Sequence, residues 1–282
     1  MTLTIGICAH NEEKNIGRLL ERLKPEPGIS EVLVVSSSTD GTNEAVRAFS
    51  EKDARIVLVE EKERRGKSAA INHILSNAKG DIIVLVSADN LPDRSSIQNL
   101  VEPFKNADVV AATGRPVPTN DRNTFFGYAS HLLWRLHHEI CREKPKLSGE
   151  LFAVRRGIVK EIPADSAVDD ASIEVQARRQ GRLVYVPAAV THMRGPENFS
   201  DFISQRRRIA FGHLKNPEKA ASQDSILVVR SALKLAGEDL GRIHWFLATA
   251  ALELYARLLA RIDMLTGKDH KVWKEIRSTK VV

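Results

Sequence analysis

Hydrophobic residues in the first third of the chain form short continuous runs that alternate with stretches of helical spacing. Between the runs, apolar residues recur at the spacing of an amphipathic helix over residues 16–23, 45–49 and 69–75. Strands that alternate with helices of this length predict βαβ units and a mostly parallel sheet flanked by helices, which is an α/β fold. The runs expected to be strands are Leu3–Cys8, Val32–Val35, Ile56–Val59 and Ile82–Val86.

In each predicted βα unit, a polar loop lies between the carboxyl end of the strand and the start of the helix. Right-handed crossovers place the carboxyl ends of parallel strands on one edge of the sheet, and open α/β sheets bind their ligands there. We therefore expect one ligand site built from four loops. These loops are Ala9–Glu13, Ser36–Thr42, Arg65–Lys67 and Ser87–Asp89.

Asp89 is the most informative polar position, because it ends the apolar run Ile82–Val86 and precedes a turn marked by Pro92. A carboxylate at the carboxyl end of a central strand is placed to handle a divalent cation or a phosphate-bearing ligand. The alternative is that Asp89 is only a turn residue or the N-cap of the next helix.

The other loops also allow two interpretations. Asp40 is expected to cap the helix that follows it, whereas Ser36 and Ser37 at the strand end are better placed to touch a ligand. Gly66-Lys67-Ser68 resembles part of a phosphate-binding P-loop, but that motif needs a glycine where this chain has Glu61. Lys67 is either an aid to diphosphate binding at a helix start or a solvated surface lysine.

The second half of the chain adds candidate catalytic groups. A strand is expected over Ser148–Arg155, and Asp169 and Asp170 stand together at a helix start, where a carboxylate is either a cap or a general base. A later helix carries three consecutive arginines, which point in different directions. Of these, Arg208 shares a face with Gln205.

The composition excludes some classes of function. The chain has 282 residues, a net charge of +6 and two cysteines, Cys8 and Cys141, without metal-ligand spacing. The mild basicity favours anionic partners, but no Lys/Arg tract is interleaved with aromatic residues, so nucleic acid is not expected. No signal peptide and no apolar run of transmembrane length are seen, and the thiols are expected to be reduced in the cytoplasm.

Residues 216–282 are expected to form a C-terminal helical extension. Apolar residues recur there at helical spacing, while Glu253, Arg257 and Arg261 line another face. Such a helix packs on the first domain, forms a homodimer or lies in a membrane interface, and packing or dimerisation is favoured. The basic tail and Trp273 keep peripheral contact with the inner face of the membrane open. The recurring apolar residues are Trp245, Ala248, Leu252, Tyr255, Leu259 and Ile262.

Seven short motifs, in this order, resemble those of glycosyltransferase family 2. The resemblance covers roughly residues 1–215, and it implies a single catalytic domain of GT-A fold, a Rossmann-like arrangement. It also implies an inverting enzyme that uses nucleoside-diphosphate sugars. The motifs are Cys8-Ala-His-Asn11-Glu12, Ser38–Thr42, Gly66-Lys67, Ser87-Ala88-Asp89, Gly149–Arg155, Asp169-Asp170 and Gln205-x-x-Arg208-Ile209.

Three positions depart from the family pattern. The acidic residue that reads the nucleobase falls at Val35 or Ser36, the first aspartate of the metal motif is Ser87, and the tryptophan after Arg208 is Ile209. The first departure predicts modest selectivity among bases. The loss of the tryptophan, together with the absence of an apolar run of transmembrane length, makes processive polysaccharide synthesis unexpected.

The resemblance implies a role for each candidate residue. Asp89 is the carboxylate that holds Mg²⁺ or Mn²⁺, Asp170 is the general base, and Asp169 is an acceptor-hydroxyl ligand. Arg208 and Lys67 stabilise the leaving diphosphate, and His192 is either a metal ligand or a structural histidine. Gln205 belongs to the same catalytic set. The residues expected to contact the nucleotide are Ala9, His10, Asn11, Glu12, Ser36, Ser37, Lys67 and Ala88.

The expected reaction is hexosyl transfer from a nucleoside-diphospho-sugar donor to the hydroxyl of a sugar, lipid-linked or small-molecule acceptor. The alternative is a degenerate, non-catalytic protein that binds sugar nucleotides or acts as a scaffold, suggested by the missing acidic residues. The retained Asp89, Asp170, Gln205 and Arg208 favour the enzyme.

Overall fold

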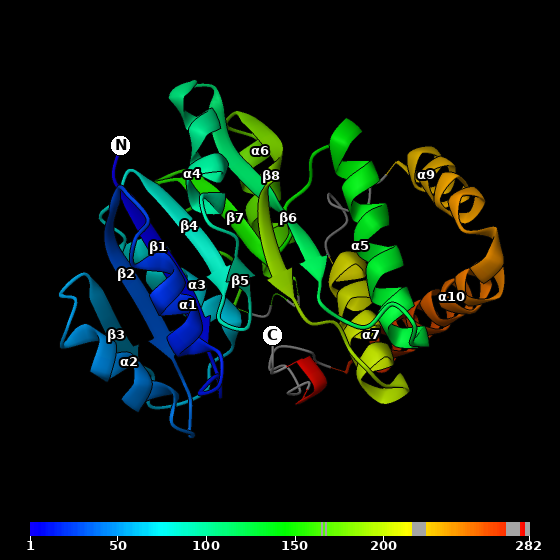
Figure 1. The fold of residues 1–282 in the computed structure, drawn as a ribbon, viewed down its shortest axis with the longest axis horizontal. Coiled ribbons are helices and arrows are strands. Elements are labelled where there is room, and N and C mark those ends of the chain that lie inside the picture. The colour runs from blue at the N-terminus through cyan, green and yellow to red at the C-terminus, as the bar shows by residue number, and fades with distance from the viewer. Residues whose placement is uncertain (165, 167, 216–223, 269–276, 280–282) are drawn as a thin grey trace.

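The computed structural model describes residues 1–164, 166, 168–215, 224–268 and 277–279. Within these residues an eight-stranded sheet has the order β3-β2-β1-β4-β7-β6-β8-β5 and forms the centre of the molecule (Figure 1). The strands are β1 (Leu3–Ala9), β2 (Ile29–Ser36), β3 (Ile56–Glu60), β4 (Ile82–Ser87), β5 (Leu91–Pro92), β6 (Val109–Pro118), β7 (Leu151–Arg155) and β8 (Arg182–Met193).

The predicted parallel half of the sheet is confirmed. β1 lies between β2 and β4 and is parallel to both, with Ile7 opposite Val34 on one side and Val86 on the other, and β3 extends this sheet at the edge of β2. The four strands predicted in this half each lie inside an observed one, whereas the strand predicted over Ser148–Arg155 begins only at Leu151. The carboxyl ends of β1, β2 and β4 consequently meet at one edge, as expected.

The second half of the sheet is mixed, which the sequence pattern did not predict. β7 runs antiparallel to β4 and to β6, β8 is parallel to β6, and the short β5 is antiparallel to β8. The antiparallel β7 begins, rather than ends, at the edge that carries the predicted loops. The residues just before Leu151 therefore lie beside the residues just after Ser87.

Helices cover both faces of the sheet. α1, α2 and α4 share one core with inward residues of β1 such as Ile5, whereas α3 and α6 pack on the opposite face. A Cβ on Gly6 would lie 2.6 Å from Ile74 Cγ2, so this glycine lets α3 approach β1 closely. The sheet-covering helices are α1 (Ile16–Leu23), α2 (Thr42–Ser50), α3 (Lys67–Asn77), α4 (Ser96–Val101), which continues into the 3₁₀-helix η1 (Glu102–Lys105), and α6 (Asp169–Arg178).

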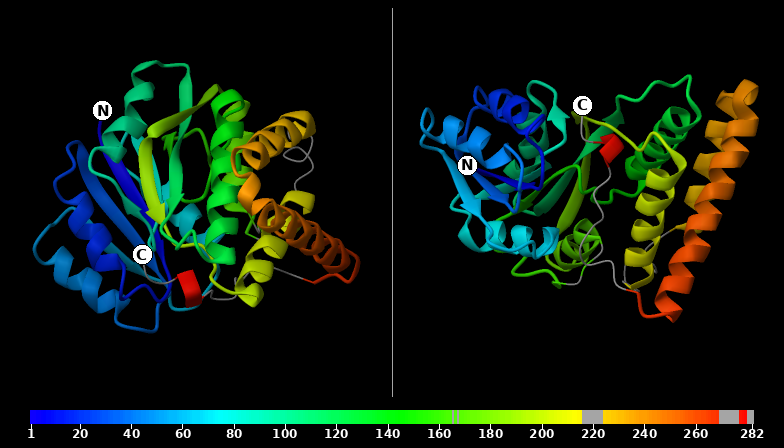
Figure 2. Two further views of the ribbon diagram at one scale, coloured as in Figure 1. Left: turned by 45° about the vertical axis from the view of Figure 1, so that its right-hand side comes forward. Right: turned by 90° about the horizontal axis from the view of Figure 1, so that it is seen from below.

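The remaining helices stand beside the sheet in a second group (Figures 1 and 2). They are α5 (Phe125–Glu143), α7 (Phe199–Lys215), α9 (Ser225–Glu238) and α10 (Ile243–Leu265), with the short 3₁₀-helices η2 (Leu240–Arg242) and η3 (Arg277–Thr279).

The predicted C-terminal helix is α10, and it packs on α5 and α7. Leu252 and Leu259 join Phe202 of α7 in one apolar cluster, and Trp245 joins Tyr128 of α5 in another, so α10 packs on these helices. Tyr255 and Ile262, predicted on the same stripe, are exposed instead, and so is Ala248. Trp273 lies outside the described residues. Across the described parts of the chain, no helix combines the length and apolarity needed to cross a bilayer.

Candidate active site

A cavity of about 960 Å³ opens at the edge of the sheet where β1, β2 and β4 end. It extends from there between α5, α7, α9 and α10. Most of the predicted site residues line it, although they are spread over the chain. Those that line it are Ala9, His10, Glu12, Ser37, Lys67, Ala88, Asp89, Asp169, Asp170, Gln205 and Arg208.

The loops after β1 and β2 are tied to each other by hydrogen bonds. His10 Nδ1 lies 2.9 Å from the Ser37 carbonyl, the Asn11 amide donates to Ser38 Oγ at 2.9 Å, and Asn11 Oδ1 accepts from the Thr39 amide. Asn11 adopts a left-handed conformation with φ of 56°, which asparagine tolerates better than most residues. These bonds give the two loops a common, fixed shape.

Asn11 and Ser36 were expected to contact the nucleotide, but neither is among the residues that line the cavity. The Asn11 side chain accepts from the Thr39 amide in the neighbouring loop. The fully buried Ser36 hydroxyl donates to Ser38 Oγ at 2.9 Å. The alternation of side chains along β2 sends Ser36 away from the cavity and leaves Val35 and Ser37 on it.

Asp40 bonds to the start of α2 as predicted, but it stands one residue before the N-cap, which is Gly41. Asp40 Oδ1 accepts from the Thr42 amide at 3.1 Å in the first turn of α2, and its Oδ2 accepts from the Glu13 amide. These hydrogen bonds lower the pKa of Asp40 against the effect of its partial burial.

Lys67 begins α3 and is half-buried in the cavity wall, so it is not a solvated surface lysine. Gly66 precedes it with φ of 98°, a conformation that favours glycine. A Cβ on Gly149 would lie 3.7 Å from Lys67 Nζ and 4.0 Å from Asp170 Oδ2. The backbone at Gly149 therefore runs close to both the ammonium and the carboxylate.

Asp89 lies in the turn after β4, and its N-cap interpretation is wrong because α4 begins only at Ser96. Ser87, which replaces the first aspartate of the metal motif, donates from Oγ to the Gly149 carbonyl at 3.0 Å. Asn90 donates from Nδ2 to Glu150 Oε2 at 2.8 Å. The segment around Asp89 is thus fastened to the start of β7.

Glu150 is a site residue that the sequence reasoning missed. Its carboxyl lines the cavity near Asp89 and Asp170, and burial raises its pKa above the ordinary value, with the negative charge of Asp89 adding to the effect. A single glutamate just before a strand belongs to no periodic pattern that would mark it as a site residue. The only signal was its position directly after Gly149 in a recognised motif.

The two adjacent carboxylates occupy different environments. Asp169 is 5 % exposed and accepts a 2.5 Å hydrogen bond from Ser68 Oγ, whereas Asp170 is half-buried and its Oδ1 accepts from the Ala171 amide. Burial raises the pKa of Asp169, and the positive charge of Lys67 opposes the rise. Asp169 is thus fixed by its hydrogen bond to Ser68, and Asp170 is the more exposed of the two carboxylates.

The three arginines of α7 separate as predicted. Arg206 pairs with Glu253 and Arg207 pairs with Asp263, both on α10. Arg208 lines the cavity, as does Arg206, whereas Arg207 does not. Burial lowers the pKa of Arg208 to about 10, and the charges of Asp169, Asp170 and Glu150 oppose the shift. Arg208 therefore keeps its charge at neutral pH, and Gln205 lies on the same wall.

His192 is placed apart from this cavity wall. It lies on β8 opposite Leu91, and its Nε2 is 2.9 Å from Asp93 Oδ1. The pairing of β8 with β5 sets this position, and His192 is not among the residues that line the cavity. A role as metal ligand would require the contact with Asp93 to open.

Ser148 is a second polar residue that the sequence reasoning did not single out as a ligand contact. It is 4 % exposed and lines the cavity, and its hydroxyl has no hydrogen-bond partner among the described residues. A buried hydroxyl without a partner is costly unless a ligand satisfies it. Ser148 is therefore a candidate contact for a ligand hydroxyl.

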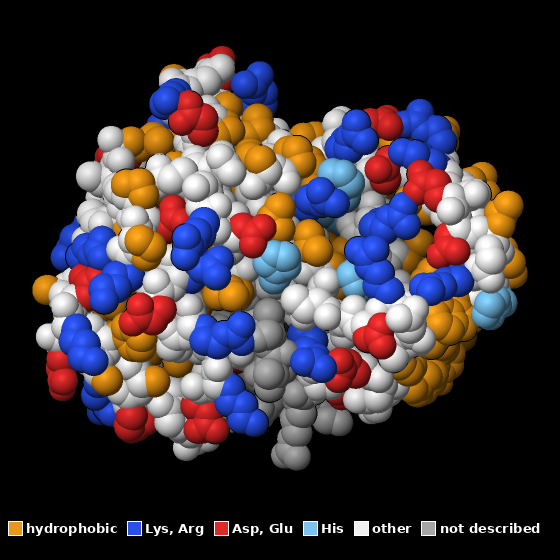
Figure 3. Space-filling model, in the orientation of Figure 1, with side chains coloured by type: hydrophobic (Ala, Val, Ile, Leu, Met, Phe, Trp, Pro, Cys, Tyr) orange, Lys and Arg blue, Asp and Glu red, His pale blue; other side chains and the backbone are white. Residues whose placement is uncertain are grey.

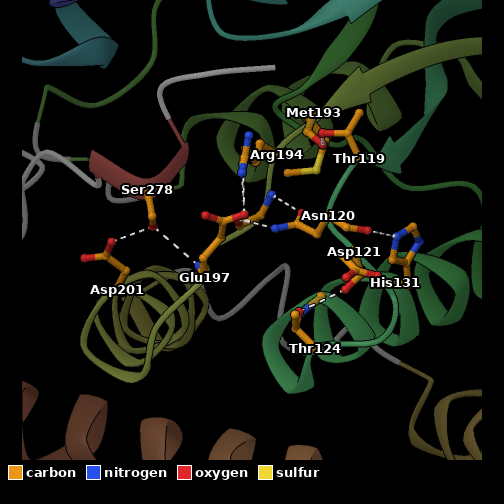
Figure 4. A network of polar contacts seen from close by, with 12 residues as sticks. Thr119, Asn120, Asp121, Thr124, His131, Met193, Arg194, Glu197, Asp201 and Ser278 are labelled. Carbon is orange, nitrogen blue, oxygen red and sulfur yellow. Dashed lines mark hydrogen bonds and ion pairs between the residues drawn. The ribbon is translucent and has the colours of Figure 1, made fainter.

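A polar network fixes the loop that leads into α7 (Figure 4). The Asn120 side chain donates to the Gly195 carbonyl at 2.9 Å and accepts from its amide at 2.7 Å, and the Asn120 carbonyl lies 3.0 Å from His131 Nε2. On the other side, Ser278 Oγ donates to Asp201 Oδ2 at 2.6 Å and accepts from the Glu197 amide. The network thereby fixes the direction of the helix that carries Gln205 and Arg208.

Two solved structures of glycosyltransferases are similar to this chain in fold. Mannosyltransferase PcManGT from Pyrobaculum calidifontis, solved with GDP-Man and Mn²⁺, has a TM-score of 0.62 and 29 % identity over 94 % of this chain and 79 % of its own. Glucosyl-3-phosphoglycerate synthase from Mycobacterium tuberculosis, solved with Mn²⁺ and UDP-Glc, has a TM-score of 0.52 and 22 % identity over 79 % of this chain and 81 % of its own. The second likeness concerns the fold alone, which is the expected GT-A fold.

Two bacterial proteins are similar in sequence. Probable glycosyltransferase YdaM of Bacillus subtilis is 28 % identical over 230 residues, which are 75 % of this chain and 55 % of YdaM. Poly-beta-1,6-N-acetyl-D-glucosamine synthase of Staphylococcus aureus is 25 % identical over 226 residues, 74 % of this chain and 54 % of the synthase. The chain thus spans a little over half the length of these two relatives.

The model of the family described as "Glycosyl transferase family 2" matches residues 4–162, more than half of the chain. The match includes every loop from the first strand to Gly149 and Glu150. With the motifs, the cavity and the fold, it shows that this chain belongs to glycosyl transferase family 2.

Proposed function

We propose that the protein is a metal-dependent, inverting glycosyltransferase that moves a hexosyl group from a nucleoside-diphosphate donor to a hydroxyl acceptor. The observation that carries this proposal is the convergence of Asp89, Lys67, Asp170 and Arg208 on one cavity, from four separate elements. A site that had lost its activity would have no reason to keep these groups together. This convergence favours an enzyme over a non-catalytic binding protein.

The donor diphosphate fits beside Asp89. Lys67 at the start of α3 and Arg208 on α7 supply positive charge, and the amino end of α3 adds its dipole. Among the described residues, no group of three or more His, Cys, Asp or Glu side chains is arranged to hold a metal alone. One or two carboxylates with substrate phosphates suffice for Mg²⁺ or Mn²⁺, and the mutual repulsion of Asp89 and Glu150 is what a cation would relieve.

When bound, the cation supplies stabilisation of the negative charge on the departing diphosphate. Asp170 takes the proton of the acceptor hydroxyl, whose oxygen forms a bond to the anomeric carbon as the bond to the diphosphate oxygen breaks. The diphosphate leaves with the bonding electron pair toward Lys67 and Arg208. Because the attack and the departure occur on opposite sides, the product has inverted configuration.

Asp169 and Ser148 support this reaction from the cavity wall. Asp169 is held by Ser68 beside Lys67 and Arg208, so it balances their charge and orients the first turn of α6. The buried Ser148 hydroxyl is available to a hydroxyl of the donor or of the acceptor. Ile209 in place of tryptophan supports transfer of a single sugar rather than processive synthesis.

The nucleobase end of the site supports only modest selectivity. Val35 and Ser37 line the cavity and Ser36 does not, so no carboxylate from the end of β2 is available to a base N–H. The complexes of the neighbours suggest GDP-Man as the first donor to test and UDP-Glc as the second.

A thermal-shift screen of nucleoside diphosphates with and without Mn²⁺ tests binding, because a bound ligand raises the melting temperature. Donor turnover and the configuration of the product then test the reaction. Metal-dependent binding followed by an inverted product supports the proposal. Binding without turnover of any donor would support the non-catalytic alternative, and a retained configuration would contradict the mechanism.

A further inference from the structure

The outer surface of α9 and α10 carries large apolar side chains that nothing in the described structure covers. Figure 3 shows hydrophobic side chains gathered over α10. On α10 they recur at positions of one helical face, so they form a continuous stripe. We call the following group the apolar ledge, each member more than half exposed: Ile226, Leu233, Leu247, Leu254, Leu258 and Leu265.

The acidic and basic residues of α10 lie on different sides of the helix. Its two acidic residues, Glu253 and Asp263, turn inward and pair with the arginines of α7. Its exposed charged residues, over the whole described helix, are Arg257 and Arg261. On α10 the exposed charges that border the ledge are thus cations, which complement anionic lipid headgroups. On α9 the exposed charged residues are Arg230, Lys234 and Glu238, two cations and one carboxylate. In a symmetric dimer the ledges of two copies would face each other. The arginines of one α10 would then meet the arginines of the other, and no exposed carboxylate of α10 would pair with them.

The ledge is continuous with the candidate active site. Away from Asp89 three helices line the cavity with many apolar side chains, among them Leu136 of α5, Leu235 of α9 and Phe246 of α10. The charged side chains of Glu253, Arg257 and Arg261 on α10 line it as well. Leu254 both lines the cavity and is 68 % exposed on the ledge. One cavity therefore has a charged end at the sheet and an apolar end that reaches the exposed surface.

We infer that the acceptor hydroxyl is carried by an amphiphile whose hydrocarbon chain occupies the apolar end of this cavity. The ledge rests on an anionic lipid surface, from which the acceptor enters between α9 and α10. This inference rests on the proposed function for the charged end. The transfer step is unchanged: the acceptor oxygen bonds to the anomeric carbon, and its proton goes to Asp170.

Alkyl glycosides with one headgroup and increasing chain length test the acceptor class. Each buried methylene is expected to lower the apparent KM by about fourfold, until the chain fills the cavity. Ala232→Trp, which fills the cavity at α9, should remove this gain and spare transfer to the methyl glycoside. Ala54→Trp, in an exposed turn, is the matched control and should keep the full dependence on chain length.

Flotation with vesicles of phosphatidylcholine, with and without phosphatidylglycerol, tests the ledge. The protein should float with the anionic vesicles, and the double variant Leu258→Gln/Leu265→Gln should not, although it should still turn over donor. Neither residue lines the cavity. Val57→Gln, at an exposed apolar position of β3, is the control and should float normally.

The outcomes separate this inference from the proposed function. Donor turnover without any dependence on chain length and without flotation would overturn the inference alone. A dimer that the double variant dissociates, together with no vesicle binding, would assign the ledge to a second copy and also overturn it. Failure of every variant and of the unmodified protein to turn over any donor would instead contradict the proposed function.

Discussion

The Ser68 hydroxyl donates a 2.5 Å hydrogen bond to Asp169 Oδ1, and so joins the first turn of α3 to that of α6 across 101 positions of the chain. The bond occupies one oxygen of a carboxylate that is almost completely buried. Both carboxylates line the cavity, but the neighbouring Asp170 is the more exposed of the two. Two adjacent residues of the same type therefore receive different roles from their surroundings.

This difference predicts different effects of the two isosteric changes. Asp170→Asn should keep donor affinity but slow single-turnover transfer by about two to four orders of magnitude, because it removes the general base. Asp169→Asn should be milder, since an amide oxygen still accepts from Ser68. The measurement is single-turnover transfer at saturating donor.

Ser68→Ala serves as the control for Asp169. If Asp169 acts through its position, this variant should resemble Asp169→Asn. An inactive Asp169→Asn beside a normal Asp170→Asn would reverse the two roles, and normal transfer by both would remove this motif from the mechanism.

The turn after β4 supports a prediction about the metal. Asp89→Ala should lower Mn²⁺-dependent affinity for a nucleoside diphosphate by about 100-fold or more, because even outer partners of a metal contribute 10- to 100-fold. The fold should persist, since Asp89 is not part of the core. Isothermal titration with and without Mn²⁺ measures the effect.

Asp93→Asn and His192→Ala are the matched controls, because these residues pair with each other beside the same turn. Both should bind Mn²⁺ and nucleotide like the unmodified protein. A loss in His192→Ala alone would show that this histidine leaves Asp93 to ligate the metal. Unchanged binding by Asp89→Ala would remove Asp89 from the metal site.

Two buried serines offer a comparison between ligand contact and stability. Ser148→Ala should leave the melting temperature unchanged or raise it, because its hydroxyl has no partner among the described residues, and should lower kcat/KM by about threefold to tenfold. Ser96→Ala should lower the stability and leave kcat/KM unchanged. Its hydroxyl donates to the Val190 carbonyl at 2.7 Å, so the change should cost about 1 kcal/mol of unfolding free energy and spare kcat/KM. Equal activity of Ser148→Ala and the unmodified protein would exclude a ligand contact there.

The parts of the fold that the sequence predicted are those governed by local pattern. The strands β1 to β4 are continuous apolar runs, and parallel βα units necessarily bring their loops to one edge. The different directions of Arg206, Arg207 and Arg208, of which Arg207 alone does not line the cavity, also follow from helical geometry.

The parts that were missed depend on contacts between distant segments. Glu150 lies near Asp89 only because β7 runs antiparallel to β4. The residues around Leu151 contain no pattern that predicts whether this strand is parallel or antiparallel. Ser36 and Ser37 differ by one position in a strand end, which decides whether a side chain meets the cavity. His192 is placed by the pairing of β8 with the two-residue β5, an element too short to predict.

The raised pKa of Glu150 predicts how the stability of the protein depends on pH. Burial and the charge of Asp89 raise the pKa of Glu150 above its ordinary value of 4.5, so the folded protein binds this proton more tightly than the unfolded chain does. Its stabilising effect is therefore complete below about pH 4.5 and is lost as the pH rises through the folded-state pKa. Glu150→Gln does not titrate, and its amide oxygen still accepts from Asn90. The variant should match the unmodified protein in melting temperature at low pH and exceed it at pH 8.

Glu139→Gln is the control with the opposite sign. Lys234 donates to Glu139 at 2.6 Å and lowers the pKa of that carboxyl, so its stabilising effect is present above the ordinary pKa and is lost as the pH falls through the folded-state value. This variant should melt below the unmodified protein at pH 8, and the difference should vanish in acid. Melting curves of the three proteins between pH 4 and pH 8 make the comparison. A pH-independent difference for Glu150→Gln, or a lower melting temperature at pH 8, would show that Glu150 is not held against repulsion from Asp89.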